Sequence, residues 1–323
     1  MNAMTAPKYR VISGGKAAAP EVLADYKRRY RFGTGAESGI MEVFSVLPGV
    51  ELIYDDFSMK EQPNAVEVEG NLLKINYCHQ GRQECRWVCN DYLYLGPGDL
   101  CITRMENDEP PLTFPTERYR GIAVVLDLDV LQEEPLPILG NHMTGLADKF
   151  CPGHHFFTMR ANAHISHIFS ELYDIPEEVR AEYFQIKVLE LLMFLWLVNP
   201  DKERRIDKIT RGQIEVIKEV KNRICEDLTR EVTIEELSKE FCISPTALKN
   251  NFKIVYNTSV KKYLRKVRME RGAQLLRIGN TPVAEIAAQV GYANQSKFAS
   301  AFKEQFGLSP VEYRKKCAHE GTE

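Results

Sequence analysis

Residues 281–310 read TPVAEIAAQVGYANQSKFASAFKEQFGLSP, and this stretch decides the fold of the C-terminal third of the chain. Thr281-Pro282 opens a helix, Gly291 supplies the positive φ angle of a tight turn, and Asn294 can cap a second helix. Apolar residues recur at helical spacing, at Val283, Ile286, Ala287 and Val290 in the first helix and at Phe298, Phe302 and Phe306 in the second. Two short helices joined by such a turn form a helix-turn-helix unit.

The same plan occurs about 50 residues earlier, which indicates an internal duplication. The matching pairs are Phe252-Lys253 with Phe302-Lys303, Asn257 with Gly307, and Ser259 with Ser309. Each Phe is expected to anchor its helix in a core, each Lys can approach a phosphate, and Asn or Gly can take the left-handed conformation that ends a helix. The chain therefore carries two tandem units, at about 233–257 and 281–307.

The first unit has its own helix-start signals. Thr233 and Glu236 form a capping box, in which the hydroxyl and the carboxylate each accept from a free backbone amide. Ser244 can cap the second helix, with Pro245 at its first position. The inner faces are formed by Ile234, Leu237 and Phe241 in the first helix and by Leu248, Phe252 and Val255 in the second.

A single basic helix is predicted between the two units, from Val260 to Leu276. Its 17 residues would span roughly 25 Å at about 1.5 Å per residue. Major-groove segments on one face of B-DNA recur about every 34 Å, so two helices joined in this way could enter adjacent grooves, with some bending of the duplex.

The charge distribution places the polyanion-binding part of the chain in the same region. The whole chain of 323 residues has a formal charge of -3, but residues 213–317 hold 19 Lys and Arg against 12 Asp and Glu, a net charge of +7. Residues 1–212 carry a net charge of -8. A basic module joined to an acidic one indicates that only the C-terminal part binds a polyanion such as DNA.

The N-terminal half is predicted to be an antiparallel β sandwich or barrel, which makes the fold class α+β. Residues 40–130 contain short apolar runs separated by turn signals, at Leu72–His79, Glu84–Cys89, Tyr92–Leu95, Leu100–Thr103 and Ile122–Asp127. Strand side chains alternate, so we expect Leu73, Ile75, Tyr77 and His79 to share the interior face of the first of these strands.

Helical periodicity begins at about residue 160 and predicts a helical hairpin. Its second helix, around residues 183–197, is apolar on nearly every side. Either a partner subunit or burial under the β domain could cover that surface. Residues 199–212, NPDKERRIDKITRG, have the composition of a linker.

The tandem arrangement resembles the DNA-binding domain of the AraC/XylS family of bacterial regulators. The likeness rests on residues 233–241, 244–253 and 262–276, and above all on 283–292, 298–303, 306–310 and 313–314. In that family the second helix of each unit enters the major groove. The resemblance therefore implies DNA contacts from outward positions, at Thr246, Lys249 and Asn250 in the first unit and at Gln295, Ser296, Lys297 and Ser300 in the second.

The chemistry of these side chains suits base edges, because Lys can bind guanine acceptors and Asn or Gln the adenine edge. Lys253 and Lys303 are expected to meet phosphate instead. Arg265, Arg268 and Arg271 could do the same, or could pair with Glu270 or stabilise the domain; each contact position could also be an ordinary solvated helix face. Gly272 replaces the alanine usual in the family and should cost the helix roughly 1 kcal/mol.

The N-terminal half resembles the cupin-type sensor domains found in one branch of the family, through residues 77–84 and 94–99. Metal-bearing cupins place several histidines in these motifs, whereas here only His79 and Glu84 are present, so we expect no metal, no cofactor and no enzyme activity. A small-molecule effector could be bound in a cavity lined by Tyr77, His79, Trp87, Tyr92 and Tyr94, although these aromatic residues could equally be plain core.

The expected organisation is a cupin-like sensor domain at 1–158, a hairpin that can dimerise at 159–198, a linker at 199–212, and a DNA-binding domain at 213–317. The expected partners are double-stranded promoter DNA, RNA polymerase, a small-molecule effector and a second copy of the chain. No stretch has the length or apolarity of a membrane helix and no secretory signal is present, which favours the cytoplasm.

Three functional classes stay open at this point. The first is a sequence-specific transcription regulator with a sensor domain, the second is a metal-dependent cupin enzyme with a DNA-binding tail, and the third is a constitutive DNA-binding protein whose N-terminal half only dimerises. A metal or redox site could also arise from Cys78, Cys85, Cys89 and Cys101, or from the pair His164 and His167, but their spacing is not that of a typical metal site.

Overall fold

The computed structural model divides the chain into two compact units, Met1–Ile209 and Thr210–Glu323. The residues it describes are 8–13, 16–35, 37–62, 64–86, 91–107, 111–140, 145–154, 156–203, 206 and 209–320. Trp87 and Cys89 lie outside the described residues.

The N-terminal unit is built on antiparallel sheets. Its main sheet has eight strands in the order β13-β11-β8-β12-β6-β5-β4-β3, and three-stranded sheets have the orders β2-β1-β7 and β14-β10-β9. The strands are β1 Tyr9–Ser13, β2 Lys16–Ala17, β3 Glu21–Ala24, β4 Lys27–Thr34, β5 Glu37–Leu47, β6 Val50–Ser58, β7 Asn64–Val68, β8 Leu72–Gly81, β9 Gln83–Arg86, β10 Asp91–Leu95, β11 Asp99–Arg104, β12 Tyr119–Asp127, β13 Phe157–Arg160 and β14 Ile209–Thr210. The prediction of an antiparallel β architecture is confirmed.

The predicted β region begins too late in the sequence. Strands β1 to β4 precede residue 40, and β4 pairs with β5 along the whole length of β4, from Lys27↔Phe44 to Thr34↔Glu37. In β4, KRRYRFGT, five polar or charged residues obscure the alternation of buried and exposed side chains. Lys27 and Arg29 pair with Glu42 on the neighbouring strand, so the sheet neutralises charges that suggest a loop when β4 is considered alone.

Both faces of the main sheet are covered, because its strands alternate between two cores. Leu73, Ile75 and Tyr77 of β8 belong to the core that also contains helical residues, whereas Leu72 and Cys78 belong to the core enclosed by the sheets. The predicted interior face of β8 is therefore the face toward the helices. His79 is exposed, so the prediction of an interior position is wrong for this residue.

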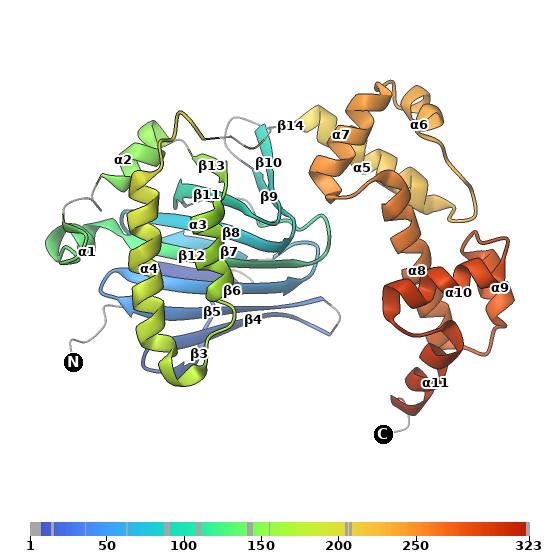
Figure 1. The fold of residues 1–323 in the computed structure, drawn as a ribbon, viewed down its shortest axis with the longest axis horizontal. Helices are drawn as coiled ribbons and strands as arrows, with labels where there is room; N and C mark the ends of the chain where they lie inside the picture. The colour runs from blue at the N-terminus through green and yellow to red at the C-terminus, as the bar shows by residue number, and fades with distance from the viewer. Residues whose placement is uncertain are drawn as a thin grey trace. The chain divides into compact units, whose positions relative to one another are not determined.

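Helices cover the first of these cores, as Figure 1 shows for α3 and α4, which lie across one face of the sheet. The helices of this unit are α1 Leu128–Glu133, α2 Leu146–Phe150, α3 Ala163–Glu171 and α4 Arg180–Leu197. One face of α4 is buried, at Phe184, Val188, Leu191, Leu192 and Leu195. The opposite face exposes Ile186, Met193 and Leu197, by 60%, 52% and 76%.

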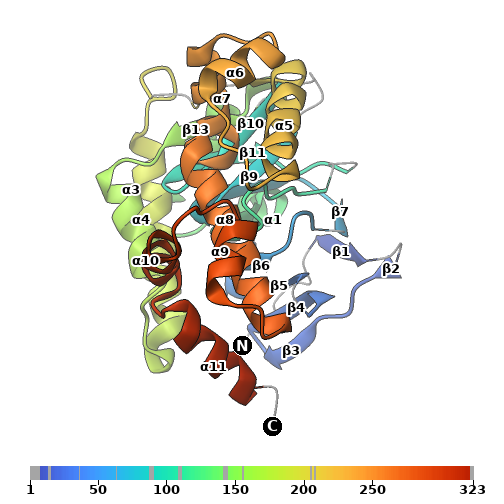
Figure 2. The same cartoon turned by 90° about the vertical axis from the view of Figure 1, so that its right-hand side faces the viewer.

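The C-terminal unit is helical. Its helices are α5 Arg211–Glu226, α6 Ile234–Glu240, α7 Pro245–Tyr256, α8 Val260–Ile278, α9 Val283–Gln289, α10 Gln295–Phe306 and α11 Pro310–Glu320. Figure 2 shows α8 running from the α6–α7 pair to the α9–α10 pair, as the sequence predicts. Helix α5 begins at Arg211, inside the stretch expected to be a linker.

Within the described part of the chain, none of the helices combines the length and the apolar character needed to span a bilayer.

Candidate nucleic-acid interface

The first helix pair, α6 and α7, is held by the caps that the sequence predicts. The Thr233 hydroxyl accepts from the backbone amide of Glu236, and the Glu236 carboxylate accepts from the backbone amide of Thr233 at 2.8 Å. The pKa of Glu236 is lowered first by the hydrogen bond from the Thr233 backbone amide and then by one that the Thr233 hydroxyl donates to the same carboxylate at 3.1 Å. Ser244 caps α7 with Pro245 at its first position, and Asn257 ends the helix at φ 55°. The capping predictions for this unit are confirmed.

The second pair, α9 and α10, is also formed as predicted. The Asn294 side chain accepts from the amides of Ser296 and Lys297, and Gly307 ends α10 at φ 74°. Helix α9 opens after Thr281-Pro282, with Pro282 as the N-cap residue and no side-chain cap. Ile286, Ala287, Val290, Phe298 and Phe302 are buried in one cluster, as the apolar spacing predicts.

The outer faces of α7 and α10 are polar and exposed. Every position expected from the resemblance to contact DNA is exposed, namely Thr246, Lys249, Asn250 and Lys253 on α7 and Gln295, Ser296, Lys297, Ser300 and Lys303 on α10. Each pair thus buries one face of its second helix and leaves the opposite face to solvent. This is the arrangement that a helix entering a DNA groove requires.

Ser296, Lys297 and Ser300 are brought together around one hollow of about 420 Å³. Its other wall comes from α8, where Arg265 pairs with Glu304 of α10. Because Glu304 offsets the charge of Arg265, Lys297 and the two serine hydroxyls are the groups of this hollow that can bind phosphate or base-edge oxygen atoms.

The arginines of α8 have separate roles. The Nε and Nη2 atoms of Arg268 donate to the carbonyl oxygens of Leu228 and Arg230 at 2.8 and 3.2 Å, and its guanidinium lies over the Tyr292 ring. Arg271 donates to Gln274 at 3.2 Å. Glu270, which could have paired with either arginine, pairs with Lys266 at 3.5 Å.

Arg268 therefore links the two helix-turn-helix units within the C-terminal unit. It joins the loop that precedes α6 to the turn that precedes α10, and it does so from the connecting helix. Gly291, at φ 81°, lies in the same junction, where a Cβ atom would be 2.2 Å from the Leu228 carbonyl oxygen. The sequence offers no signal for this role, because the partners of Arg268 are backbone carbonyls about 40 residues away.

A close contact explains why position 272 is a glycine, and the sequence gives no sign of this contact. A Cβ atom at this position would lie 3.0 Å from two ring carbons of Phe298. The glycine lowers helix propensity, but it allows α8 to approach the core of the second pair closely.

The described residues among those expected to line an effector cavity, Tyr77, His79, Tyr92 and Tyr94, have different surroundings. The ring of Tyr77 stacks on Phe169 of α3 at 4.3 Å between centroids, whereas the Tyr94 hydroxyl donates to the carboxylate of the buried Glu84. His79 lies against Tyr173, with a pKa lowered by partial burial and by Arg120. Tyr92 is half-buried, and Trp87 lies outside the described residues.

Among the residues that the structure describes, no cluster of three His, Cys, Asp or Glu side chains could hold a metal ion. Cys78 and Cys101 are buried, and burial raises the pKa of the Cys78 thiol. His164 stacks on Phe194 at 5.0 Å, whereas His167 lies 3.5 Å from Glu171. The two histidines thus have different neighbours.

Comparison with known proteins identifies the C-terminal unit. A family model described as "Helix-turn-helix domain" matches residues 237–316. The Msm operon regulatory protein of Streptococcus mutans is 32% identical over 99 residues, which cover 31% of this chain and 36% of that protein. A putative AraC-like transcription regulator of Streptomyces antibioticus is 37% identical over 83 residues, 26% of this chain and 27% of that protein.

Among solved structures, the C-terminal domain of AraT, a response regulator from Geobacillus stearothermophilus, is 32% identical. The match covers 31% of this chain and 84% of the AraT domain, with a TM-score of 0.30. The matched segments span only about a third of the curated relatives' length. The C-terminal unit is thus a helix-turn-helix domain similar to those of AraC-type transcription regulators.

Proposed function

We propose that the protein is a sequence-specific transcription regulator that binds double-stranded promoter DNA through α7 and α10. The observation that carries the proposal is the pairing of two capped helix-turn-helix units, each with an exposed polar outer face, on one connecting helix. The similarity to named transcription regulators supports it. RNA polymerase is the partner through which such a protein would act on transcription.

In this proposal Lys249, Asn250 and Gln295 contact base edges, and Thr246, Ser296, Lys297 and Ser300 complete the two contact surfaces. Lys253 and Lys303 lie one turn or more further along α7 and α10 and meet phosphates. Base contacts would set the sequence preference, whereas phosphate contacts would set the register and the salt dependence.

The proposal is tested by retaining genomic fragments on the full chain, sequencing them, and measuring affinity for the enriched site by fluorescence anisotropy. Affinity should fall steeply with salt, because phosphate contacts release counterions. Lys249→Ala should weaken binding to the enriched site by about 1–3 kcal/mol. Lys266→Ala is the matched control, since it removes the same charge from an exposed position paired with Glu270.

The result that would contradict the proposal is equal retention of all fragments, or equal weakening by the two lysine variants. Either would mean that the chain binds DNA only through its overall charge.

The N-terminal unit is proposed to act as a cupin-like sensor for a small-molecule effector. Its antiparallel sheets and helix-covered face support this role. A second copy of the chain is the proposed cover for α4, because Val179, Ile186, Met193 and Leu197 expose apolar surface along and beside one face of that helix. Analytical ultracentrifugation of the full chain and of Ile186→Glu would test the dimer, which the substitution should dissociate.

A further inference from the structure

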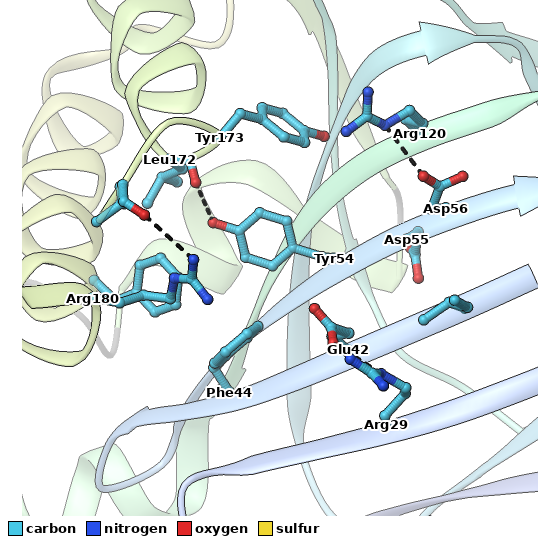
Figure 3. Close-up of a pocket in the computed structure, with 13 residues that line it drawn as sticks. Arg29, Glu42, Phe44, Tyr54, Asp55, Asp56, Arg120, Leu172, Tyr173 and Arg180 are labelled. Atoms are coloured by element: carbon cyan, nitrogen blue, oxygen red, sulfur yellow. Dashed lines mark hydrogen bonds and ion pairs between the residues drawn. The ribbon is translucent and has the colours of Figure 1, made fainter. Parts of the chain in front are cut away.

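A pocket of about 390 Å³ opens on the helix-covered side of the main sheet of the N-terminal unit. Figure 3 shows its walls, which come from β4, β5, β6 and β12 on one side and from the α3–α4 turn and α4 on the other. The volume lies within the range of small-molecule sites. Of the residues that the sequence suggests for an effector cavity, the described ones, Tyr77, His79, Tyr92 and Tyr94, do not line it.

The apolar part of the pocket is an aromatic cluster. The ring of Phe44 contacts those of Tyr54 and Phe184 edge-on, with centroids 5.6 and 5.0 Å away, and Tyr54 lies 5.7 Å from Tyr173. The Tyr54 hydroxyl donates to the Leu172 carbonyl at 2.6 Å, which fixes the α3–α4 turn against the sheet. These rings form a preorganised surface for a flat apolar group.

The acidic groups of the pocket are largely neutralised by cations. Glu42 binds Arg29 at 2.6 Å and Lys27 at 3.1 Å. Asp56 binds Arg118 at 2.8 Å, and Arg118 does not line the pocket.

Asp55 also borders the pocket, and its burial raises the pKa of its carboxyl to about 6. Its position in β6 alternates with Tyr54 and Asp56, so its side chain belongs to the opposite face of the strand. This acid therefore does not offset the cations on the helix-covered side.

Two arginines are engaged only weakly. Among the described residues, Arg120 reaches Asp56 through its Nε atom at 3.4 Å, and its guanidinium lies 5.3 Å from the Tyr173 ring centre. Within the described part of the chain, Arg180 donates only to the Ile175 carbonyl and to the exposed Glu177, both at 3.3 Å. Arginine presents five donors, so both guanidinium groups retain capacity for a ligand.

Tyr173 adds a hydroxyl without a partner. Its oxygen is buried and has no hydrogen-bond partner among the described residues. In Figure 3 this hydroxyl points toward Arg120. A buried donor without an acceptor is uncommon, and here it lies beside a guanidinium that has free donors.

From these contacts we infer that the pocket binds a small organic monocarboxylate with a flat apolar body. The carboxylate accepts hydrogen bonds from Arg120 and from Tyr173, Arg180 contributes positive charge on the α4 side, and the body lies on Phe44, Tyr54 and Phe184. The inference rests on the proposed function in that it identifies this pocket as the effector site.

The test uses 3-phenylpropanoate as the probe, titrated calorimetrically into the full chain. The probe should bind saturably with one site per chain. The uncharged analogue 3-phenylpropan-1-ol should bind at least tenfold more weakly, and 3-phenylpropylamine should not bind. Equal binding of the alcohol, preferential binding of the amine, or no saturable binding of the acid would each overturn the inference.

Variants locate the site. Arg120→Gln should weaken binding of the acid at least tenfold, and Tyr173→Phe should weaken it several-fold while keeping the ring contacts. Arg104→Gln is the matched control, because Arg104 belongs to the same sheet and pairs with Asp148, and neither residue lines the pocket. If Arg104→Gln weakens binding as much as Arg120→Gln, the pocket is not the site.

DNA affinity, measured by anisotropy with and without the probe, separates the two proposals. If the isotherm is flat while DNA binding persists, the pocket assignment fails and the regulator proposal stands. If the acid binds but no sequence-specific DNA binding occurs in any condition, the regulator proposal fails and the pocket assignment stands.

Discussion

The two helix-turn-helix units share one plan but differ in their turns. In the first unit one residue separates the left-handed Cys242, at φ 51°, from the cap Ser244. In the second unit two residues separate the left-handed Gly291, at φ 81°, from the cap Asn294. The left-handed position is exposed in the first unit and is packed against the Leu228 carbonyl in the second. The same backbone conformation is therefore tolerated by a cysteine in one unit and requires glycine in the other.

The largest effect should come from Gly291→Ala. The new Cβ would overlap the Leu228 carbonyl in addition to the left-handed strain, so we expect a loss of about 3–5 kcal/mol in the stability of the C-terminal unit. Native-state hydrogen exchange of the α9 and α10 amides in the full chain measures this loss. Cys242→Ala keeps a side chain at a left-handed backbone position and creates no new overlap, so it should cost less than about 0.5 kcal/mol. Similar losses of stability for the two variants would contradict the proposed difference between the two turns.

The second-largest effect should come from Arg268→Ala, which removes the contacts that link the two helix-turn-helix units. Loss of two charge-assisted hydrogen bonds should destabilise the junction by about 2 kcal/mol. Affinity for DNA with both half-sites should fall more than affinity for DNA with one, because the spacing of α7 and α10 is no longer fixed. The control is Arg271→Ala, which loses only a contact with Gln274. An equal effect on both kinds of DNA would assign Arg268 to phosphate contact instead.

A smaller difference should appear at the helix starts. Thr233→Ala removes the cap of α6 and should cost about 1 kcal/mol. Thr281→Ala should change stability by less than about 0.5 kcal/mol, because no side chain caps α9. Denaturant unfolding of the full chain, followed through the C-terminal transition, compares the two. A cost for Thr281→Ala equal to that for Thr233→Ala would contradict the assigned caps.

The smallest effect should come from Cys242→Gly, which removes the strain of a residue with a side chain in the left-handed backbone conformation. The relief of about 1–2 kcal/mol is partly offset by glycine's greater backbone entropy, of about 0.5–1 kcal/mol. The net gain should be about 0.5 kcal/mol, visible as slower exchange of the α6 and α7 amides. A loss of stability would mean that the Cys242 side chain contributes contacts that outweigh its strain.

The C-terminal fold was predictable because its signals are local. Caps such as Ser244 and Asn294, and helix ends such as Asn257 and Gly307, act within a few residues of their own position. The exception is Pro282, where a proline at the cap position replaces a side-chain cap. The contacts of Arg268 and Gly272 were not predictable, since they depend on how α8 packs against the two pairs.

The N-terminal fold was predictable only in class. Strand β4 is stabilised by ion pairs across the sheet, and the pocket joins Arg120 of β12 to Tyr173, which is 53 residues later in the sequence. Such convergence is fixed by strand order and by the position of the α3–α4 turn, and neither leaves a periodic pattern in the sequence. The aromatic candidate Tyr77 proved to be packed against Phe169 of α3, whereas Tyr94 bonds to the buried Glu84.

The central claim is that α7 and α10 occupy adjacent major grooves on one face of the duplex, at a separation set by the 19-residue α8. It is tested most directly by inserting base pairs between the half-sites of the enriched DNA and measuring the affinity of the full chain. An insertion of about 5 base pairs, half a helical turn, should reduce binding to that of a single half-site, because it turns the second groove away. Unchanged affinity after this insertion would contradict the claim that one chain engages both grooves.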